Sequence, residues 1–297
     1  MKRLITDGFL VVDKSPGMTS HDVVAIARRA LGTKKVGHAG TLDPMATGVL
    51  VLGFGNGTRL LQYITDGEKE YEATIVLGSS TVTDDAEGQV VKVATAEEIA
   101  AISDEQIGEA LGRMVGVIQQ RPSSVSAVKV AGERAYERVR AGEEFELPAR
   151  EIHISSLIIG AIRRLEQAIE VDISVTCGAG TFIRAIARDC GQSLGVGGHL
   201  NALRRSRVAN FGLDEAISLE ALKSGAFHPL HIGEVAAKTF PIRTLIGDET
   251  RELSFGRAIS PNSTDQITAA MEQDRLIALL SNEEDHARPI AVFAPRP

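Results

Sequence analysis

Two kinds of hydrophobic pattern run along this 297-residue chain. Short apolar runs and alternations of apolar with polar residues favour β-strands, because successive strand side chains point to opposite faces. They occur at residues 9–12, 49–52, 70–77, 152–159 and 169–177. Apolar residues at helical spacing predict helices at residues 59–65, 104–114, 132–142, 182–190 and 218–224, and a longer one between a cap at Thr19 or Ser20 and Gly32. Gly178 to Thr181 would supply the turn and the cap before the helix at 182–190, and Thr58 would cap the helix at 59–65.

Strands and helices therefore alternate without a regular βαβ rhythm, which predicts an α+β fold on a mixed, mostly antiparallel sheet. The pattern weakens at residues 229–241. Beyond it, apolar runs at 276–280 and 289–293 flank an acidic turn and predict a small β-rich module. We expect two domains, a catalytic domain at residues 1–236 and a small C-terminal domain at 237–297.

The composition, 43% hydrophobic and 24% charged, is typical of a soluble globular protein. Asp7 and Asp13 interrupt the apolar run at the start, so we expect neither a signal peptide nor a membrane span. Cys177 and Cys190 lie thirteen residues apart, with no histidine at metal-ligand spacing. We interpret them as reduced core thiols of a cytoplasmic protein, and we predict no metal site.

The net charge of −7 by itself argues against binding to nucleic acid, because phosphate contacts come from lysine and arginine. The distribution of charge changes that conclusion. Residues 1–60 hold eight Lys/Arg against four Asp, a balance of +4, and residues 182–208 hold five Arg against one Asp, again +4. Such local excesses are typical of an RNA-binding surface. Ordinary basic helix faces are the alternative.

One acidic residue, Asp43, occupies unusual surroundings. It lies in a glycine-bounded loop that leads into the apolar strand at 49–52, and Pro44 biases it toward extended conformations. A loop of this kind suits a carboxylate at the mouth of a dry pocket. A simple Asx-type turn accounts for the same residues on turn chemistry alone.

The loop resembles the motif that carries the catalytic aspartate in the TruB family of pseudouridine synthases, the branch that acts on the T arm of tRNA. Further segments resemble the family in family order, over roughly the first 240 residues. They are residues 9–20, 69–73, 123–129, 180–184 and 203–205. The resemblance implies a pseudouridine-synthase-like catalytic domain followed by a PUA-like tail.

The resemblance also implies an isomerase that converts uridine to pseudouridine at position 55 of the T loop of tRNA. This reaction oxidises nothing and takes no group from outside, so we expect no cofactor. It needs a group that adds to, or stabilises, an electron-poor carbon, and a carboxylate can do so. It also needs a dry place in which the detached uracil is held.

By resemblance, Asp43 is the nucleophile and Arg184 is the arginine that pairs with it. A guanidinium fork beside the acid would keep it ionised in an apolar site. Tyr71 matches the tyrosine that stacks on the target base, and it is a candidate for the proton transfer. The alternatives are an ordinary surface arginine and a half-buried packing tyrosine.

The remaining matched residues are expected to bind the substrate. His38 resembles a histidine that helps to displace the target nucleotide, although a backbone-bonded loop histidine is the alternative. Phe182 stands where the family commonly has tyrosine, so it keeps the stacking surface and lacks the hydroxyl. Leu203 is expected to line the pocket. Phosphate contacts are expected from Lys14, Lys129, Arg204 and Arg205.

Two other functions stay open at the level of the sequence. One is a module that binds or folds the tRNA elbow without chemistry, and the other is a guide-RNA-dependent enzyme acting on ribosomal RNA. We expect a monomer that binds the T arm of tRNA. The tail at residues 242–297 holds six Arg against nine Asp/Glu, which predicts weak affinity for RNA.

Overall fold

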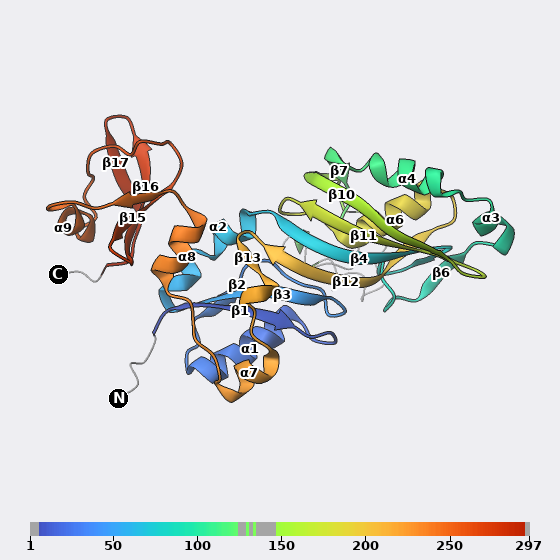
Figure 1. Cartoon of the computed structure of the whole chain (residues 1–297), viewed down its shortest axis with the longest axis horizontal. Coiled ribbons are helices and arrows are strands. Elements are labelled where there is room, and N and C mark those ends of the chain that lie inside the picture. Colours follow the sequence, from blue (N-terminus) through green and yellow to red (C-terminus); the bar gives the residue numbers. More distant parts are fainter. Residues whose placement is uncertain (1–5, 124–128, 131–132, 135–146, 295–297) are drawn as a thin grey trace.

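The structure is a computed structural model that describes residues 6–123, 129–130, 133–134 and 147–294. A long mixed sheet forms the body of the molecule, and a smaller β-sheet lies beyond one end of it (Figure 1). The predicted α+β class and the mostly antiparallel sheet are confirmed.

The long sheet has nine strands, arranged along the path β1-β3-β12-β4-β11-β10-β7, with β2 attached to β3 and β13 attached to β12. Every pair is antiparallel except β3 with β12, which run parallel. The strands are β1 (Gly8–Lys14), β2 (Val36–His38), β3 (Thr47–Phe54), β4 (Lys69–Leu77), β7 (Gly116–Gln120), β10 (Arg150–Arg164), β11 (Ile169–Cys177), β12 (Gly198–Val208) and β13 (Phe211–Gly212).

Helices cover both ends of this sheet. In Figure 1, α1 and α7 lie against β1, whereas α4 and α6 cover the face near β10 and β11. The helices are α1 (Ser20–Leu31), α2 (Leu61–Asp66), α3 (Ala96–Ala100), α4 (Asp104–Gly112), α6 (Ile183–Ser193), α7 (Leu219–Ser224) and α8 (Ile232–Thr239), with 3-10 turns η1 (Gly55–Arg59) and η2 (Leu213–Glu215). Two short hairpins are β5 (Ser79–Thr81) with β6 (Val90–Val93), and β8 (Lys129–Val130) with β9 (Glu133–Arg134).

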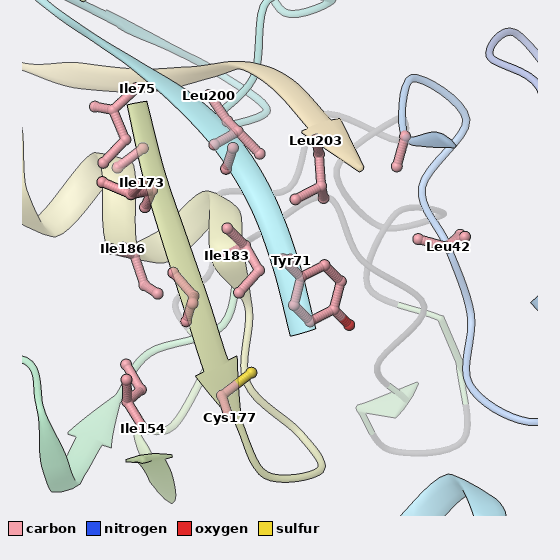
Figure 2. Packing of buried hydrophobic residues seen from close by; sticks show 14 of the residues in the cluster. Leu42, Tyr71, Ile75, Ile154, Ile173, Cys177, Ile183, Ile186, Leu200 and Leu203 are labelled. Atoms are coloured by element: carbon pink, nitrogen blue, oxygen red, sulfur yellow. The ribbon is translucent and has the colours of Figure 1, made fainter. Parts of the chain in front are cut away.

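The elements form for the reasons that the pattern indicates. Thr19 caps α1 in a reciprocal capping box with Asp22, and Gly32 ends the helix in a left-handed conformation. Strand β11 alternates buried and partly exposed residues along its whole length. The buried residues of β4, β11 and α6 join in one core cluster (Figure 2), to which residues of α1 also belong.

Several local predictions were wrong. Thr58 does not cap the helix at 59–65, because it lies within η1 and its hydroxyl donates back to the Gly55 carbonyl. Thr181 does not cap α6 either, since the N-cap residue is Phe182. The helix predicted at 132–142 falls mostly outside the described residues, and Glu133–Arg134 within it form β9.

The C-terminal module is a four-stranded sheet with the order β14-β15-β16-β17. Its elements are β14 (Ile242–Thr244), β15 (Thr268–Glu272), β16 (Arg275–Glu283), β17 (His286–Val292) and the short helix α9 (Glu249–Ser254). The two predicted strands correspond to β16 and β17. The predicted division at residue 236 falls inside α8, whose Val235 and Ala236 pack in one cluster with residues of β1 and of β16, and the exact boundary stays a prediction.

Helix α6 and strand β12 meet backbone to backbone. A methyl group added at Gly191 of α6 would lie 2.1 Å from the carbonyl carbon of Gly197, and one at Gly198 of β12 would lie 2.3 Å from the Ala187 oxygen. Only glycine permits this approach. The contact sets how α6 crosses the sheet.

Cys177 and Cys190 are buried free thiols, and burial raises their pKa to about 11 and about 12, so both stay protonated at neutral pH. None of the helices within the described ranges is long and apolar enough to cross a membrane.

Candidate active site

A pocket of about 350 Å³ opens where the loop between β2 and β3 faces the start of α6. Its wall combines segments that are far apart in the sequence: the loop at residues 40–43, the ends of β4 and β12, and the turn at residues 178–184. The lining includes Asp43, Tyr71, Phe182, Arg184, Leu203 and Arg205. The structure therefore brings together six of the ten residues predicted from the sequence.

The loop that carries Asp43 is held in place by hydrogen bonds to its backbone carbonyls. Each carbonyl oxygen from residue 40 to residue 44 accepts a hydrogen bond: those of Gly40 and Thr41 from the Arg205 guanidinium, that of Leu42 from the Ser20 hydroxyl, that of Asp43 from the Ala46 amide, and that of Pro44 from the Lys14 ammonium. Satisfied backbone groups make an irregular segment rigid. The loop thus holds the Asp43 carboxylate in a fixed place.

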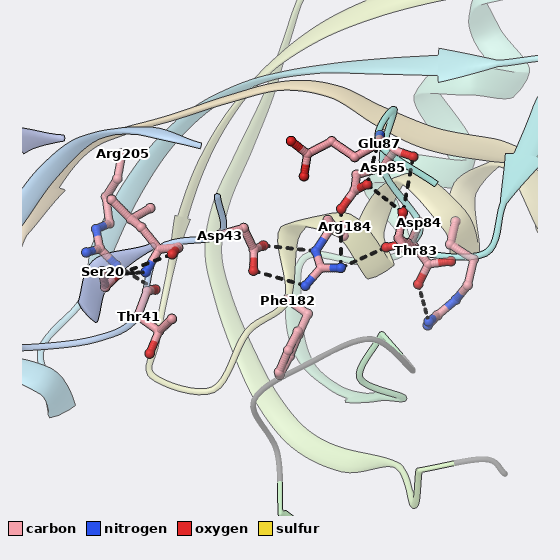
Figure 3. Close-up of polar contacts among 12 residues, drawn as sticks. Ser20, Thr41, Asp43, Thr83, Asp84, Asp85, Glu87, Phe182, Arg184 and Arg205 are labelled. Carbon is pink, nitrogen blue, oxygen red and sulfur yellow. Dashed lines mark hydrogen bonds and ion pairs between the residues drawn. The ribbon is translucent and has the colours of Figure 1, made fainter. Parts of the chain in front are cut away.

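Arg184 binds this carboxylate with both arms of its guanidinium (Figure 3). Its Nε donates to Asp43 Oδ2 at 2.9 Å and its Nη2 donates to Asp43 Oδ1 at 3.0 Å. The Arg184 side chain is 5% exposed and that of Asp43 is 32% exposed. The bidentate pair therefore has its cation buried and its anion facing the open pocket.

The other side of the Arg184 guanidinium is also occupied. Its Nη1 donates to the Thr83 carbonyl at 2.8 Å and lies 3.3 Å from Asp85 Oδ2. Asp85 is itself fixed, because its Oδ1 accepts from the Thr83 hydroxyl at 2.5 Å and from the Glu87 amide at 3.1 Å. The Thr83 carbonyl and the Asp85 carboxylate thus determine how Arg184 presents itself to Asp43.

Tyr71 and Leu203 supply the apolar part of the wall. Both are buried side chains of neighbouring strands, β4 and β12, and Figure 2 shows the Tyr71 hydroxyl on the side that faces the loop of Leu42. Burial raises the pKa of Tyr71, so its phenol stays neutral at neutral pH. A neutral aromatic ring beside a leucine is a surface on which a flat base can stack.

Phe182 is positioned through its backbone. The Gln120 side chain accepts from the Phe182 amide at 2.8 Å and donates to the Phe182 carbonyl at 3.0 Å, so one amide group holds the backbone of the residue that precedes α6. The ring of Phe182 then lines the pocket next to Arg184.

Four predicted residues lie outside the pocket lining. Lys14 is fully buried, and its ammonium donates to the carbonyls of Ser15, Met18 and Pro44, so the predicted phosphate contact does not fit its position. Arg204 forms a bidentate pair with Asp13 at 3.1 and 2.8 Å and remains partly exposed. Lys129 lies in β8, and its side chain is outside what the structure describes.

His38 contacts the edge of His21, with 5.6 Å between the ring centres, and its buried Nδ1 has no hydrogen-bond partner among the described residues. Burial lowers the pKa of His38, and the neighbouring His21 and Arg205 lower it further. His38 is therefore neutral at physiological pH and lies beside the catalytic loop. Arg205 lines the pocket, is 1% exposed, and donates to the carbonyls of Val49, Thr41 and Gly40. Its phosphate contact stays a prediction.

Sequence reasoning missed Lys69, Asp85, Gln120 and Arg150. Lys69 precedes Tyr71 by two residues in β4, so the strand period alone puts both on one face. Arg150 precedes the strand predicted at 152–159 and lines the rim. No local signal marks Asp85 or Gln120, because the first lies in a polar turn and the second pairs with a residue 62 positions away.

Among the described residues, no group of histidine, cysteine, aspartate and glutamate side chains could hold a metal ion. What the pocket offers is a fixed carboxylate, a neutral phenol, stacking surfaces and buried cations. This set suits reversible addition to an electron-poor carbon of a flat, uncharged heterocycle.

Comparison with known proteins agrees with this chemistry. Family profiles match nearly the whole chain: "TruB family pseudouridylate synthase (N terminal domain)" at residues 28–183, "tRNA pseudouridylate synthase B C-terminal domain" at 184–229, and "tRNA Pseudouridine synthase II, C terminal" at 240–294. The chain is 50% identical over 300 residues to tRNA pseudouridine synthase B of Arthrobacter sp. (strain FB24), covering 97% of each chain. It is 48% identical over 289 residues to the protein of the same name from Mycobacterium sp. (strain KMS), covering 97% of this chain and 96% of the relative.

Two solved structures share the fold. One is an H/ACA ribonucleoprotein bound to a substrate RNA containing 2′-deoxyuridine, with a TM-score of 0.72 at 22% identity over 99% of this chain and 87% of the other. The second is a Cbf5-Nop10-Gar1 complex, with a TM-score of 0.72 at 24% identity over 98% of this chain and 86% of the other. At this identity the likeness concerns the fold alone.

Proposed function

Because the chain belongs to the TruB family of tRNA pseudouridine synthases, we propose that Asp43 is the nucleophile with which it acts on its substrate. The protein is an isomerase that forms pseudouridine 55 in the T loop of tRNA. The roles of individual residues in that reaction are our proposal.

The pair between Asp43 and Arg184 carries the proposal. A carboxylate that faces a pocket while both its oxygens are bound by a buried guanidinium is held ionised and oriented. An ionised carboxylate can add to an electron-poor carbon, whereas a turn-forming aspartate needs no arginine. Arg184 acts as a positioning residue in this scheme, since it works through Asp43.

The reaction breaks the bond between N1 of uracil and C1′ of ribose, and the electron pair of that bond stays on the base. The base then turns, and an electron pair at C5 forms the new bond to C1′. C5 loses its proton and N1 takes one up, so that the product is an isomer of the substrate. Asp43 stabilises or traps the electron-poor carbon while the base is detached.

The target base must leave its stack to reach this pocket, at a cost of a few kcal/mol. We propose that Tyr71 and Phe182 stack on the extruded base and that Leu203 excludes water beside it. His38 next to the catalytic loop is proposed to fill the space that the nucleotide vacates, and Arg204 and Lys129 are proposed to contact phosphates. Tyr71 remains the candidate for transfer of the C5 proton.

Different observations argue against each of the two alternative functions that the sequence left open. A module that only binds the tRNA elbow does not need a carboxylate aimed into a cavity, because RNA phosphates repel it. The two H/ACA structures described above are 22% and 24% identical to this chain, whereas the two tRNA pseudouridine synthase B relatives described above are 48% and 50% identical.

The test is the Asp43→Asn variant, which keeps the shape of the side chain and removes its charge. Carbodiimide treatment and primer extension on unmodified tRNA transcripts should show no stop at uridine 55 after incubation with this variant. The matched control is Asp172→Asn, because Asp172 also binds an arginine, Arg163, with both oxygens, on the exposed surface of β11. Persistence of the stop with Asp43→Asn would remove the assignment of the nucleophile.

We further propose that the chain works as a monomer in the cytoplasm and needs no cofactor. Its two cysteines are buried free thiols, in keeping with a reducing compartment. Sedimentation of the protein with and without tRNA should give the mass of one chain and of a one-to-one complex. Dialysis against a chelator should leave the rate unchanged. The proposal would be contradicted if dialysis abolished activity and a divalent ion restored it without changing the folding of the tRNA.

A further inference from the structure

Two cations on the pocket wall have no carboxylate partner among the described residues. Lys69 is 6% exposed and Arg205 is 1% exposed, and both line the cavity that contains Asp43. Lys69 donates to the carbonyls of Thr65 and Gly67, and Arg205 donates to those of Val49, Thr41 and Gly40. Each cation thus binds backbone carbonyls and forms no ion pair with a described carboxylate.

The two cations are also close to each other. A methyl group added at Gly40 would lie 3.5 Å from Arg205 Nη1 and 4.0 Å from Lys69 Cε, so both side chains meet at one point of the catalytic loop. Burial lowers the pKa of Lys69, and the charge of Arg205 lowers it further. Two neighbouring buried charges of one sign destabilise a folded protein unless an anion joins them.

The other charges of the pocket do not supply this anion. Asp43 is already bound by Arg184, and Asp85 lies behind the same guanidinium. The pocket therefore carries a positive excess on the wall formed by β4 and β12. This wall also holds Tyr71, whose strand position is directly opposite Arg205.

A purely structural role explains only part of the arrangement. Lys69 lies just beyond the end of α2, and its ammonium binds two carbonyls there, as a lysine that caps a helix does. Two carbonyls use two of the three ammonium protons. Helix capping also gives no reason for placing the ammonium beside Arg205 on a cavity wall.

The anion that meets this wall must come from the substrate nucleotide, either as a phosphate or as the detached base. Arg150 at the rim is exposed and has no ion-pair partner in the described part of the chain, and a backbone phosphate that remains outside the pocket can reach it. Lys69 and Arg205 are buried, on the strand face of the stacking tyrosine. A phosphate cannot enter there together with its ribose and base.

We propose that Lys69 and Arg205 stabilise the negative charge that uracil carries between the breaking of its N1–C1′ bond and the formation of its C5–C1′ bond. This inference rests on the function proposed above. It concerns the detached base, whereas Asp43 acts on the electron-poor carbon. The electron pair of the N1–C1′ bond remains on the base and spreads to its carbonyl oxygens, which accept from the two cations. Formation of the C5–C1′ bond uses an electron pair of the base and removes this charge. Loss of the proton at C5 and uptake of one at N1 then give the product.

The test uses the Lys69→Gln variant of the full chain, because glutamine retains two donors for the carbonyls of Thr65 and Gly67 and lacks the charge. Because 5-fluorouridine has no proton to lose at C5, single-turnover rates are measured as loss of the N1-linked nucleoside at position 55. These rates and tRNA affinity are measured with transcripts that carry uridine or 5-fluorouridine there. We expect the rate with uridine to fall about 100-fold, the order of magnitude for loss of one group that stabilises developing charge, with unchanged affinity. With 5-fluorouridine the loss should be several-fold smaller, since fluorine stabilises the detached base as an anion.

The control is Lys92→Gln, because Lys92 also donates to a backbone carbonyl, that of Gly195, and lies outside the pocket. It should behave as the wild type with both transcripts. An equal loss with both substrates indicates a structural role, and a loss confined to affinity indicates a phosphate contact; either result overturns the inference. An inactive wild type or an active Asp43→Asn variant would instead refute the proposed function, whatever Lys69→Gln does.

Discussion

Asp85 lies against the Arg184 guanidinium, with 3.3 Å between its Oδ2 and Arg184 Nη1, while Asp43 binds the other two nitrogen atoms. One arginine thus joins a carboxylate that faces the pocket to one that is buried. Because Asp85 fixes the guanidinium, we expect Asp85→Asn to lower the single-turnover rate about tenfold, with unchanged tRNA affinity, as a charge-assisted contact of 1.5–3 kcal/mol becomes a neutral one.

The control for this variant is Glu170→Gln. Glu170 is the second carboxylate of Arg163, just as Asp85 is the second carboxylate of Arg184, yet it lies on the exposed surface of β11. Its replacement should leave the rate unchanged. A normal rate for Asp85→Asn would mean that the Thr83 carbonyl alone orients Arg184.

Gln120 holds the backbone of Phe182 through two hydrogen bonds and is buried. Gln120→Leu leaves the amide and the carbonyl of Phe182 without these partners, so we expect the free energy of unfolding to fall by about 1–3 kcal/mol. The start of α6 would also lose its fixed position, and the pseudouridylation rate should fall with it. Urea unfolding and single-turnover assays measure both effects. The neighbouring Gln119→Leu, which removes no hydrogen bond between described residues, should change neither.

Lys14 predicts a pH dependence of stability. Burial lowers its pKa from 10.5 in the unfolded chain to about 8 in the folded one. Between these two values the unfolded chain binds more protons, so stability rises with pH in this window and Lys14 is least favourable below pH 8. Between pH 7 and pH 9.5, the free energy of unfolding of the wild type should rise by about 2 kcal/mol relative to that of Lys14→Met. Urea unfolding at the two pH values measures the gain; the exposed Lys223→Met should give a constant difference.

Gly48 predicts a severe folding defect. It lies opposite Arg205 where β3 runs parallel to β12, at φ +103°, and an added methyl group would lie 2.1 Å from the Arg205 carbonyl oxygen. Gly48→Ala must separate these strands, so we expect a loss of at least about 4 kcal/mol. At Gly32 the backbone is also left-handed, but an added methyl group would contact nothing within 4 Å. Gly32→Ala should therefore lower the free energy of unfolding by about 1–2 kcal/mol, from backbone strain alone. Thermal unfolding compares the two, and equal losses would mean that strain alone matters at Gly48.

The sequence predicts the regular elements of the catalytic domain well, because their apolar residues repeat with the period of the strand or helix that they form. Helix α1 begins after Thr19 and ends before Gly32, as its cap residues indicate. Strand β11 covers residues 169–177, as its alternation indicates. The weaker predictions concern contacts between distant segments. The backbone of Phe182 at the start of α6 is held by Gln120 in β7, and no pattern near Thr181 could reveal this contact.

For the site, the sequence predicts a group of residues that the structure brings together, but not where each basic side chain points. Asp43, Tyr71 and Arg184 meet in one pocket, as their resemblance to a family motif implies. Lys14 and Arg205 turn inward to backbone carbonyls, because burial in the fold outweighs their usual preference for solvent. Whether an isolated basic residue faces RNA or supports a loop depends on the tertiary structure.

The contact of Gly191 with the backbone of Gly197 limits how this enzyme can be changed. Arg184 sits on α6 and Arg205 on β12, so any side chain inserted between helix and strand displaces one catalytic wall against the other. Engineering toward a different RNA must therefore keep the glycine contact between α6 and β12. It can instead vary the rim of the pocket, where exposed residues such as Arg150 can be exchanged without moving Asp43 and Arg184.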